Sequence, residues 1–266
     1  MRRRVGEREI TYDDAGAGAP VVLLHPFPCN RRYWATVAAA LAAPDRRLLT
    51  VDAPGFGESA AATTFAIADW ADDVAALLDA LDLATATVVG LSMGGYAALA
   101  MAARHRARLA ALVLADTRAA ADSAEVRRAR ADAIALLDSA GVAGYLDRSL
   151  PRLLAPEAPA AVLVQARALA ETRADQLRAG IAALRDRPDR TAELSAILCP
   201  TLVLAGARDQ VVPPEEMRGM AATIPGARFA ILEGAGHLAS LEAPGPFLAA
   251  VRGFLDQAAA RQSGAA

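Results

Sequence analysis

Residues 90–95 of the chain read Gly90-Leu91-Ser92-Met93-Gly94-Gly95. A short β-branched stretch precedes them, and an apolar, alanine-rich stretch with helical character follows. A G-x-S-x-G motif between a strand and a helix holds its serine on a sharp, exposed turn, because the glycines let neighbouring backbone approach closely. By itself the motif allows two interpretations. It is either a turn that presents a nucleophile or a glycine-rich turn that packs a helix on a sheet.

On both sides of this motif, short apolar runs alternate with longer helical stretches. This pattern is typical of a mostly parallel sheet covered by helices, an α/β fold. Buried strands are predicted at residues 20–25, 47–52, 86–90, 110–115, 201–205 and 228–232. Residues 9–12 alternate in polarity and predict an antiparallel strand at the sheet edge. Helices are predicted at residues 65–81, 93–104 and 244–257.

The stretch at residues 118–195 differs from the rest. It has no convincing strand and is interrupted by glycine and proline, which predicts several short helices inserted between two strands. We therefore expect an α/β core at residues 1–117 and 196–260 and a helical insert at 118–195. Residues 261–266 are expected to form a disordered tail.

Composition narrows the classes of partner. The chain has 266 residues, 55% of them hydrophobic and 22% charged, as in a soluble globular protein. A formal net charge of -2 gives no electrostatic reason to expect binding to nucleic acid or to a membrane surface. All of the 28 basic residues are arginine, which we interpret as a compositional bias.

Targeting and cofactor signals are also missing from the sequence. No apolar stretch follows the arginines at residues 2–4, so we expect no signal peptide, no membrane segment and a cytoplasmic location. The two cysteines, Cys29 and Cys199, fit no metal or redox spacing and are expected to be free thiols. We expect neither a metal nor another cofactor.

A serine hydroxyl needs a base before it can attack, and the chain has three histidines. His237 lies in a glycine-rich loop after the last predicted strand, where it can reach over the carboxyl ends of the strands. His105 stands between arginines at a helix end and is expected to be solvated. His25 follows the first buried strand and is either structural or part of the site. We therefore predict His237 as the base for Ser92.

Two aspartates compete for the role of the acid that orients the base. Asp209 follows the strand at 201–205, whereas Asp116 follows the strand at 110–115. The chain order Ser, Asp, His favours Asp209. The strand before Asp116 is the one that follows Ser92, so Asp116 stays open as the alternative acid.

Backbone amides must stabilise the charge that develops on a carbonyl oxygen under attack. The amide of Met93, directly after the serine, is one candidate. The second should come from the loop after the first buried strand, which reads Pro26-Phe27-Pro28. Since proline has no N–H, Phe27 is the donor that this trio offers.

These stretches together resemble the α/β-hydrolase superfamily over nearly the whole chain. The matching features are residues 25–28 with Trp34, 52–59, 90–95, 206–209 and 236–237. Within the superfamily, the motif at 90–95 and the helical insert resemble carboxylesterases and 3-oxoadipate enol-lactonases. One difference is Pro26, at a position where the family usually has glycine.

The resemblance implies that residues 52–59 form a structural loop beside the site and that residues 118–195 form a helical cap over it. Caps in this family set substrate choice, and this cap is mostly aliphatic, with Tyr145 as its aromatic residue. A lactonase acting on a carboxylated lactone would need an arginine there. The sequence does not choose among the arginines of the cap.

We expect a serine hydrolase that cleaves a small-molecule carboxylic ester or lactone through a Ser92-His237-Asp209 triad and an acyl-enzyme. One alternative is a cofactor-free perhydrolase or haloperoxidase-like activity on the same triad. Another is a non-catalytic receptor that binds a ligand in the same pocket. The sequence indicates neither the acyl chain length nor the oligomeric state.

Overall fold

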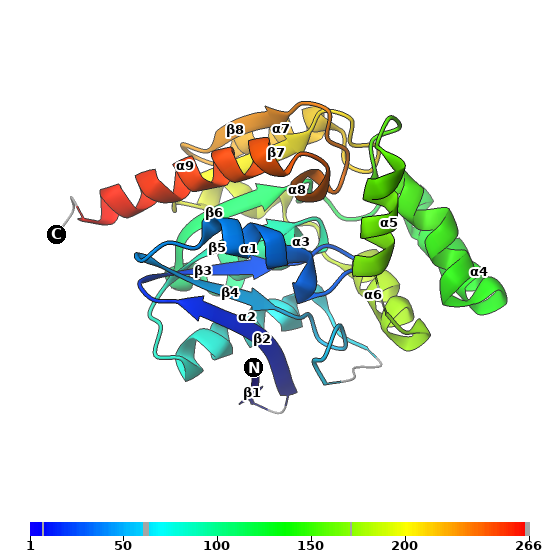
Figure 1. Cartoon of the computed structure of the whole chain (residues 1–266), viewed down its shortest axis with the longest axis horizontal. Helices are drawn as coiled ribbons and strands as arrows, with labels where there is room; N and C mark the ends of the chain where they lie inside the picture. The colour runs from blue at the N-terminus through cyan, green and yellow to red at the C-terminus, as the bar shows by residue number, and fades with distance from the viewer. Residues whose placement is uncertain (7, 61–63, 171, 264–266) are drawn as a thin grey trace.

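An eight-stranded sheet forms the centre of the computed structural model, which describes residues 1–6, 8–60, 64–170 and 172–263. The strand order is β1-β2-β4-β3-β5-β6-β7-β8 (Figure 1). The strands are β1 (Arg2–Val5), β2 (Arg8–Gly16), β3 (Ala19–Leu24), β4 (Arg46–Val51), β5 (Ala86–Leu91), β6 (Leu109–Ala115), β7 (Thr201–Gly206) and β8 (Arg228–Leu232). The pairs from β4 to β8 are parallel, whereas β1 and β2 are antiparallel.

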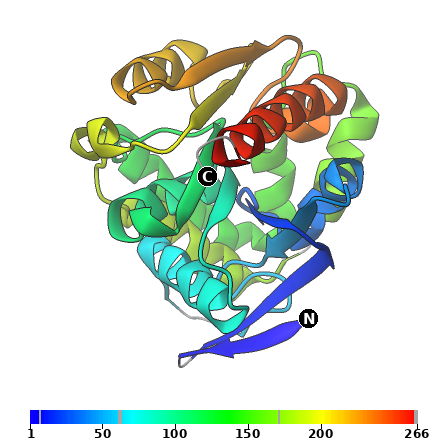
Figure 2. The ribbon, with the colours of Figure 1, turned by 90° about the vertical axis from the view of Figure 1, so that its left-hand side faces the viewer.

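Helices cover both faces of this sheet because its central strands are apolar on both sides. In β3, Val22 and Leu24 pack into one buried cluster, while Val21 and Leu23 pack into the other. One face carries α2 (Ile67–Ala80), α3 (Met93–Arg104) and α7 (Pro214–Thr223), and the other carries α1 (Ala35–Leu41) and α9 (Pro244–Ser263). Figure 2 shows the sheet between these two layers.

The six predicted buried strands are confirmed as β3 to β8, with ends that differ by at most one residue. The alternating stretch at residues 9–12 is confirmed as part of β2, but its predicted place at the sheet edge is wrong. Strand β1 pairs outside it, with Val5 opposite Arg8. Three arginines in a row hide this edge strand from a hydrophobicity pattern, and their side chains are exposed.

The insert between β6 and β7 is helical, with no strand among its described residues. It contains α4 (Ala124–Ser149), η3 (Leu150–Leu153), α5 (Ala160–Leu169), α6 (Ala174–Asp186) and η4 (Thr191–Ala196). The prediction of short helices alone is wrong for α4, which has 26 residues. Its chain is interrupted at Gly141, where φ is 68° and ψ is -175°, so two helical stretches join at a kink.

The insert lies beyond the carboxyl ends of the parallel strands, as Figure 1 shows for α4, α5 and α6. Short elements complete the chain, namely η1 (Arg31–Trp34), η2 (Arg106–Arg108) and α8 (Ala239–Glu242). Helix α9 extends to Ser263, three residues into the segment expected to be a tail, and residues 264–266 lie outside the described residues. None of the helices described is both long and apolar enough to cross a membrane.

Candidate active site

Ser92 lies on the turn between β5 and α3, with φ of 52° and ψ of -113°. A non-glycine residue in this region is strained by about 1–3 kcal/mol, so neighbouring contacts must hold it. The Ser92 amide donates to Ala115 O at 2.9 Å, and the Thr117 hydroxyl donates to Ser92 O at 3.0 Å. These contacts fix the serine where sheet and helix meet.

Two glycines of the motif allow α3 to approach the sheet. A Cβ at Gly94 would lie 2.0 Å from the carbonyl oxygen of Leu24 in β3. A Cβ at Gly90 would lie 2.3 Å from the carbonyl oxygen of Gly94. No larger residue fits either position without moving backbone, which confirms the reason given above for small residues on both sides of the serine.

The structure brings Ser92, His237 and Asp209 together. Ser92 Oγ lies 2.8 Å from His237 Nε2, and His237 Nδ1 lies 2.8 Å from Asp209 Oδ2. Because the carboxylate can only accept, Nδ1 carries the proton and Nε2 is left to accept from the serine hydroxyl. The three residues are buried, with 8%, 2% and 7% of their surfaces exposed, respectively.

Asp209 is held by the backbone around it. Its second oxygen, Oδ1, accepts from the amides of Val211 at 2.7 Å and Val212 at 3.0 Å. The amide of its neighbour Arg208 donates to Ala235 O at 2.8 Å, which joins the loop of Asp209 to the loop of His237. The carboxylate that faces His237 is therefore fixed in orientation.

Asp116 lies beside this group and makes no hydrogen bond to His237. Its Oδ1 accepts from the Gly206 amide at 2.7 Å and its Oδ2 from the Ala239 amide at 3.4 Å. Complete burial raises its pKa well above the usual value, and the nearby charge of Asp209 raises it further. Asp116 thus ties the end of β7 to the segment after His237, while Asp209 makes the contact expected of the acid.

The amides of Phe27 and Met93 were the expected donors to a developing oxyanion. Met93 is the first residue of α3, where a backbone N–H has no partner within the helix. Neither amide donates a hydrogen bond within the described part of the chain. Phe27 is itself buried and meets the cap, since a Cβ at Gly180 of α6 would lie 2.6 Å from its ring.

His25 is a structural residue next to the Phe27 loop. Its Nε2 accepts from the Ala53 amide at 3.0 Å, and its Nδ1 lies 3.0 Å from Pro26 O. Because Nε2 accepts a hydrogen bond, the ring proton is on Nδ1, and complete burial lowers the pKa of the imidazole. His25 therefore links the Phe27 loop to the loop at residues 52–59. His105, by contrast, ends α3 and contacts Asp72 at 2.6 Å, away from Ser92.

The loop at residues 52–59 is held by a buried carboxylate. Asp52 accepts from the Arg31 amide at 2.7 Å, from the Arg31 guanidinium at 2.7 Å and from the Glu58 amide at 3.0 Å. Both oxygens are thus occupied by structural partners. These contacts agree with a structural loop beside the site.

Glu242, which the sequence did not single out, connects the cap to the loop of His237. Its Oε2 accepts from the Ala155 amide at 2.7 Å, and its Oε1 accepts from the Leu238 amide at 3.2 Å. Burial raises the pKa of this carboxyl, while the backbone donors lower it. A Cβ at Gly236 would lie 2.3 Å from Ala155 N, so cap and histidine loop are in close contact.

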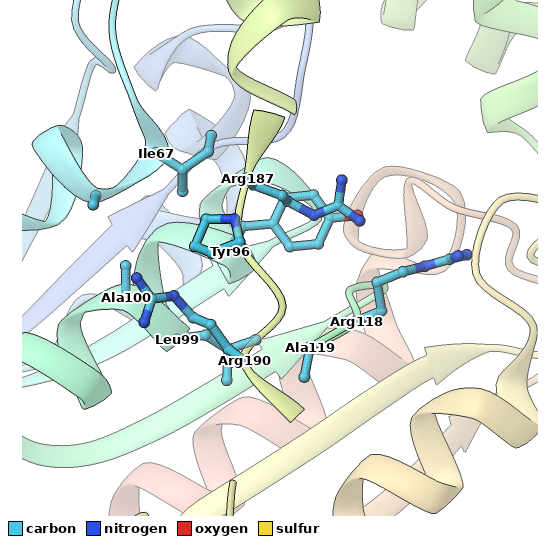
Figure 3. A pocket seen from close by; sticks show the side chains of 10 residues that line it. Ile67, Tyr96, Leu99, Ala100, Arg118, Ala119, Arg187 and Arg190 are labelled. Atoms are coloured by element: carbon cyan, nitrogen blue, oxygen red, sulfur yellow. The ribbon is translucent and has the colours of Figure 1, made fainter. Parts of the chain in front are cut away.

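A buried ion pair closes the base of the cap. Arg187, after α6, donates to Asp122 Oδ1 at 2.6 Å, and the two side chains are 3% and 2% exposed. The other oxygen of Asp122 accepts from Arg130 at 3.2 Å. The Arg187 guanidinium also lies over the ring of Tyr96, 4.1 Å from its centroid, beside a cavity of about 10 Å³ (Figure 3). Tyr96 stands one turn after Ser92 in α3, so the pair links both ends of the cap to the helix that follows Ser92.

A cleft of about 710 Å³ opens between the cap and the core. Phe27 and Pro28 line it from the core, together with Gln210 and Val211, which follow Asp209. On the cap side it is lined mostly by α4 and η3. A cleft of this size accommodates a small organic molecule. Among the described residues, no three His, Cys, Asp or Glu side chains are grouped so that they could hold a metal ion.

Comparison with known proteins is consistent with this arrangement. Residues 19–244 match the family model described as the alpha/beta hydrolase fold. The chain belongs to the α/β-hydrolase family. This α/β hydrolase is therefore a member of a family of hydrolytic enzymes, with the fold that the sequence predicted.

Individual relatives of this α/β hydrolase carry several hydrolase names. It is 36% identical to a putative carbamate hydrolase RutD from Caulobacter, over 86% of its own length and 87% of the relative's. A thermophilic esterase from Thermogutta terrifontis is 35% identical, with a TM-score of 0.91 and coverage of 97% and 99%. An enol-lactonase from Burkholderia xenovorans is 30% identical, with a TM-score of 0.87 and coverage of 96% and 100%.

Proposed function

We propose that the protein hydrolyses a carboxylic ester or lactone of a small molecule, with Ser92 as nucleophile, His237 as base and Asp209 as the acid that orients it. The observation that carries this proposal is the pair of 2.8 Å contacts that join the three side chains in sequence. A hydroxyl, an imidazole and a carboxylate in this order are the parts that acyl transfer requires.

In the proposed reaction, Ser92 Oγ attacks the carbonyl carbon while its proton passes to His237 Nε2. A bond forms between Oγ and carbon, and the carbonyl electrons move to the oxygen. The amides of Phe27 and Met93 donate to that oxygen, because their positions after β3 and β5 leave both N–H groups without other acceptors in the described chain. Asp209 stabilises the imidazolium that forms.

The tetrahedral intermediate then expels the alkoxide, which takes the proton from His237. An ester thereby releases its alcohol, and a lactone opens while its alcohol end stays attached to the acyl group. Water attacks the acyl-enzyme in the second half, with His237 again accepting and returning the proton. The burial of the three side chains strengthens these electrostatic interactions, since little water competes for them.

A second candidate is cleavage of a carbamate by the same nucleophile. The relative named as a putative carbamate hydrolase favours it, since it is 36% identical over most of both chains. The attack on a carbamate carbonyl uses the same base and the same oxyanion donors. A matched pair of aryl ester and aryl carbamate with one leaving group separates the two candidates by their kcat/KM values.

The central experiment is steady-state hydrolysis of a short 4-nitrophenyl ester by Ser92→Ala. We expect turnover to fall by on the order of 10⁴-fold or more, because the acyl-enzyme cannot form. Ser139→Ala is the matched control, since that exposed hydroxyl bonds only to carbonyls of its own helix, and it should retain full activity. Wild-type activity in a folded Ser92→Ala protein would overturn the proposal.

The remaining alternatives have measurable consequences on the same protein. Halogenation of monochlorodimedone that depends on acetate and peroxide, at a rate above that of ester hydrolysis, would favour a perhydrolase. Binding of esters without any turnover would favour a receptor. We expect ester hydrolysis to be the faster reaction.

A further inference from the structure

The arginines of the cap divide into a paired and an unpaired set. Nine of them make ion pairs, namely Arg118, Arg127, Arg130, Arg167, Arg173, Arg178, Arg185, Arg187 and Arg190. Within residues 118–170 and 172–195, the arginines without an ion pair or side-chain hydrogen bond are Arg128, Arg148 and Arg152. Two of these three, Arg148 and Arg152, line the cleft that begins at the Phe27 loop.

The cleft carries an excess of positive charge. Four arginines and two aspartates line it, so its formal charge is positive by two, in a chain whose net charge is -2. Two of the arginines are already engaged, because Arg118 lies 3.4 Å from Glu216 and Arg130 lies 3.2 Å from Asp122. A cleft with one sign of charge and low-dielectric walls concentrates ligands of the opposite charge.

Arg148 and Arg152 line this cleft from neighbouring elements of the chain. Arg148 stands in the last turn of α4, and Arg152 follows in η3. Both side chains are exposed, so they are free to meet a ligand without leaving a partner. Asp132 also lines the cleft and has no ion pair among the described residues, so the unpaired groups Arg148, Arg152 and Asp132 together carry one positive charge. This net charge of the unpaired lining groups suits a ligand with a single negative charge.

We propose that Arg148 and Arg152 bind a carboxylate at the end of the substrate remote from the scissile bond. The inference rests on the proposed function, and it assigns the substrate class as esters or lactones that carry a free carboxylate. Guanidinium groups match a planar carboxylate with two parallel N–H donors. The aliphatic remainder of the cleft, with Val126, Ala133 and Leu136, accepts the methylene chain between the two ends.

The test compares mono-4-nitrophenyl suberate with its methyl ester, which has the same chain and leaving group but no charge. We expect wild-type protein to hydrolyse the anionic ester with the higher kcat/KM. The double variant Arg148→Gln/Arg152→Gln should lose ten- to hundredfold in kcat/KM for the anionic ester, an effect typical of charge-assisted hydrogen bonds. The loss should be in KM, because the same contact is made in the ground state and in the transition state.

The neutral ester and a third arginine provide the controls. The double variant should hydrolyse the methyl ester as the wild type does. Arg128→Gln removes the unpaired cap arginine that does not line the cleft and should leave both substrates unchanged. High salt should reduce the preference of the wild type for the anionic ester, since it screens exposed charges. An equal preference in the wild type and the double variant would overturn the inference while leaving the proposed function intact.

Binding of suberate itself separates the two proposals. If neither ester is hydrolysed, the proposed function fails, and calorimetry with suberate still tests the arginines. Weaker binding by the double variant than by Arg128→Gln would then support the anion site. Equal binding, or no binding to any of the proteins, would overturn it.

Discussion

Asp116 and Asp209 follow neighbouring strands, β6 and β7, yet they have different partners. Asp209 Oδ2 lies 2.8 Å from His237 Nδ1, whereas Asp116 accepts from the amides of Gly206 and Ala239. The two carboxyl groups are close enough for the charge of Asp209 to raise the pKa of Asp116. Asp209 faces the imidazole of His237, and Asp116 joins the segments that carry Asp209 and His237.

This difference predicts unequal effects of two identical substitutions. Asp209→Asn should lower kcat for a 4-nitrophenyl ester by about 10³-fold or more, because the imidazole loses the partner that sets its tautomer. Asp116→Asn keeps one acceptor oxygen for the Gly206 amide and should lower kcat by less than about tenfold. Initial-rate kinetics on both folded variants measure the difference. A larger loss in Asp116→Asn would reassign the acid.

The buried pair of Asp122 and Arg187 predicts a large effect on stability. Arg187→Met should lower the free energy of unfolding by about 3–5 kcal/mol, because it leaves a buried carboxylate with one partner fewer. Arg127→Met breaks an exposed ion pair with Asp186 and should change the free energy of unfolding by no more than about 1 kcal/mol. Chemical denaturation of both variants tests the contrast. Equal free energies of unfolding in Arg187→Met and Arg127→Met would show that the ion pair of Asp122 and Arg187 does not stabilise the cap.

Close approach of α3 to β3 predicts that Gly94 tolerates no side chain. Gly94→Ala places a Cβ 2.0 Å from Leu24 O and should destabilise the fold by about 3 kcal/mol while lowering activity. In Gly219→Ala the Cβ meets nothing within 4 Å on helix α7. That control should be more stable than wild type by about 0.5–1 kcal/mol. Thermal and denaturant unfolding measure the loss of stability in Gly94→Ala and the gain in Gly219→Ala. A stable, active Gly94→Ala protein would contradict the close packing of α3 on β3.

Asp73 on α2 predicts a pH dependence of stability. Burial raises the pKa of this carboxyl to about 6, against the opposing effect of Arg8, whose Nε lies 2.9 Å away. The folded state therefore binds the proton more tightly than the unfolded state, so the contribution of Asp73 to stability falls as pH rises through this range. Between about pH 4 and pH 7, the stability of wild type relative to Asp73→Asn should fall by on the order of 2 kcal/mol.

The matched control for this experiment is Asp79→Asn, on the same helix. The Asp79 side chain is 71% exposed and meets Arg108 at the surface. Its removal should leave the pH dependence of the wild type nearly unchanged. Denaturant titrations across this pH range measure both curves. A difference between wild type and Asp73→Asn that is constant with pH would contradict the raised pKa.

The parts of the fold that the sequence predicted are those with a local signal. The central strands are continuous apolar runs because both of their faces are covered, and the turn at Ser92 carries its own glycines. The prediction of His237 as the base rested on the small number of histidines. For the acid, chain order favoured Asp209 but left Asp116 open, because both aspartates stand after parallel strands. The structure adds that Asp209, and not Asp116, contacts His237.

What the sequence did not reveal depends on contacts between distant segments. Asp122 and Arg187 are 65 residues apart, and each is one charged residue among many in the cap. Glu242 reaches Ala155 across 87 residues. Strand β1 has three arginines where a strand pattern needs apolar residues, and it is stabilised by pairing with β2. In each case the structural role of the residue or strand depends on its partner in space, which the residue type alone does not indicate.

The most direct measurement for the central claim is labelling with a fluorophosphonate, followed by mass spectrometry of the digested protein. We predict one label per chain, on the peptide that contains Ser92, and much slower labelling of His237→Ala, in which the base is missing. Labelling of a different residue, or none on the active wild-type protein, would contradict the assignment of Ser92 as nucleophile.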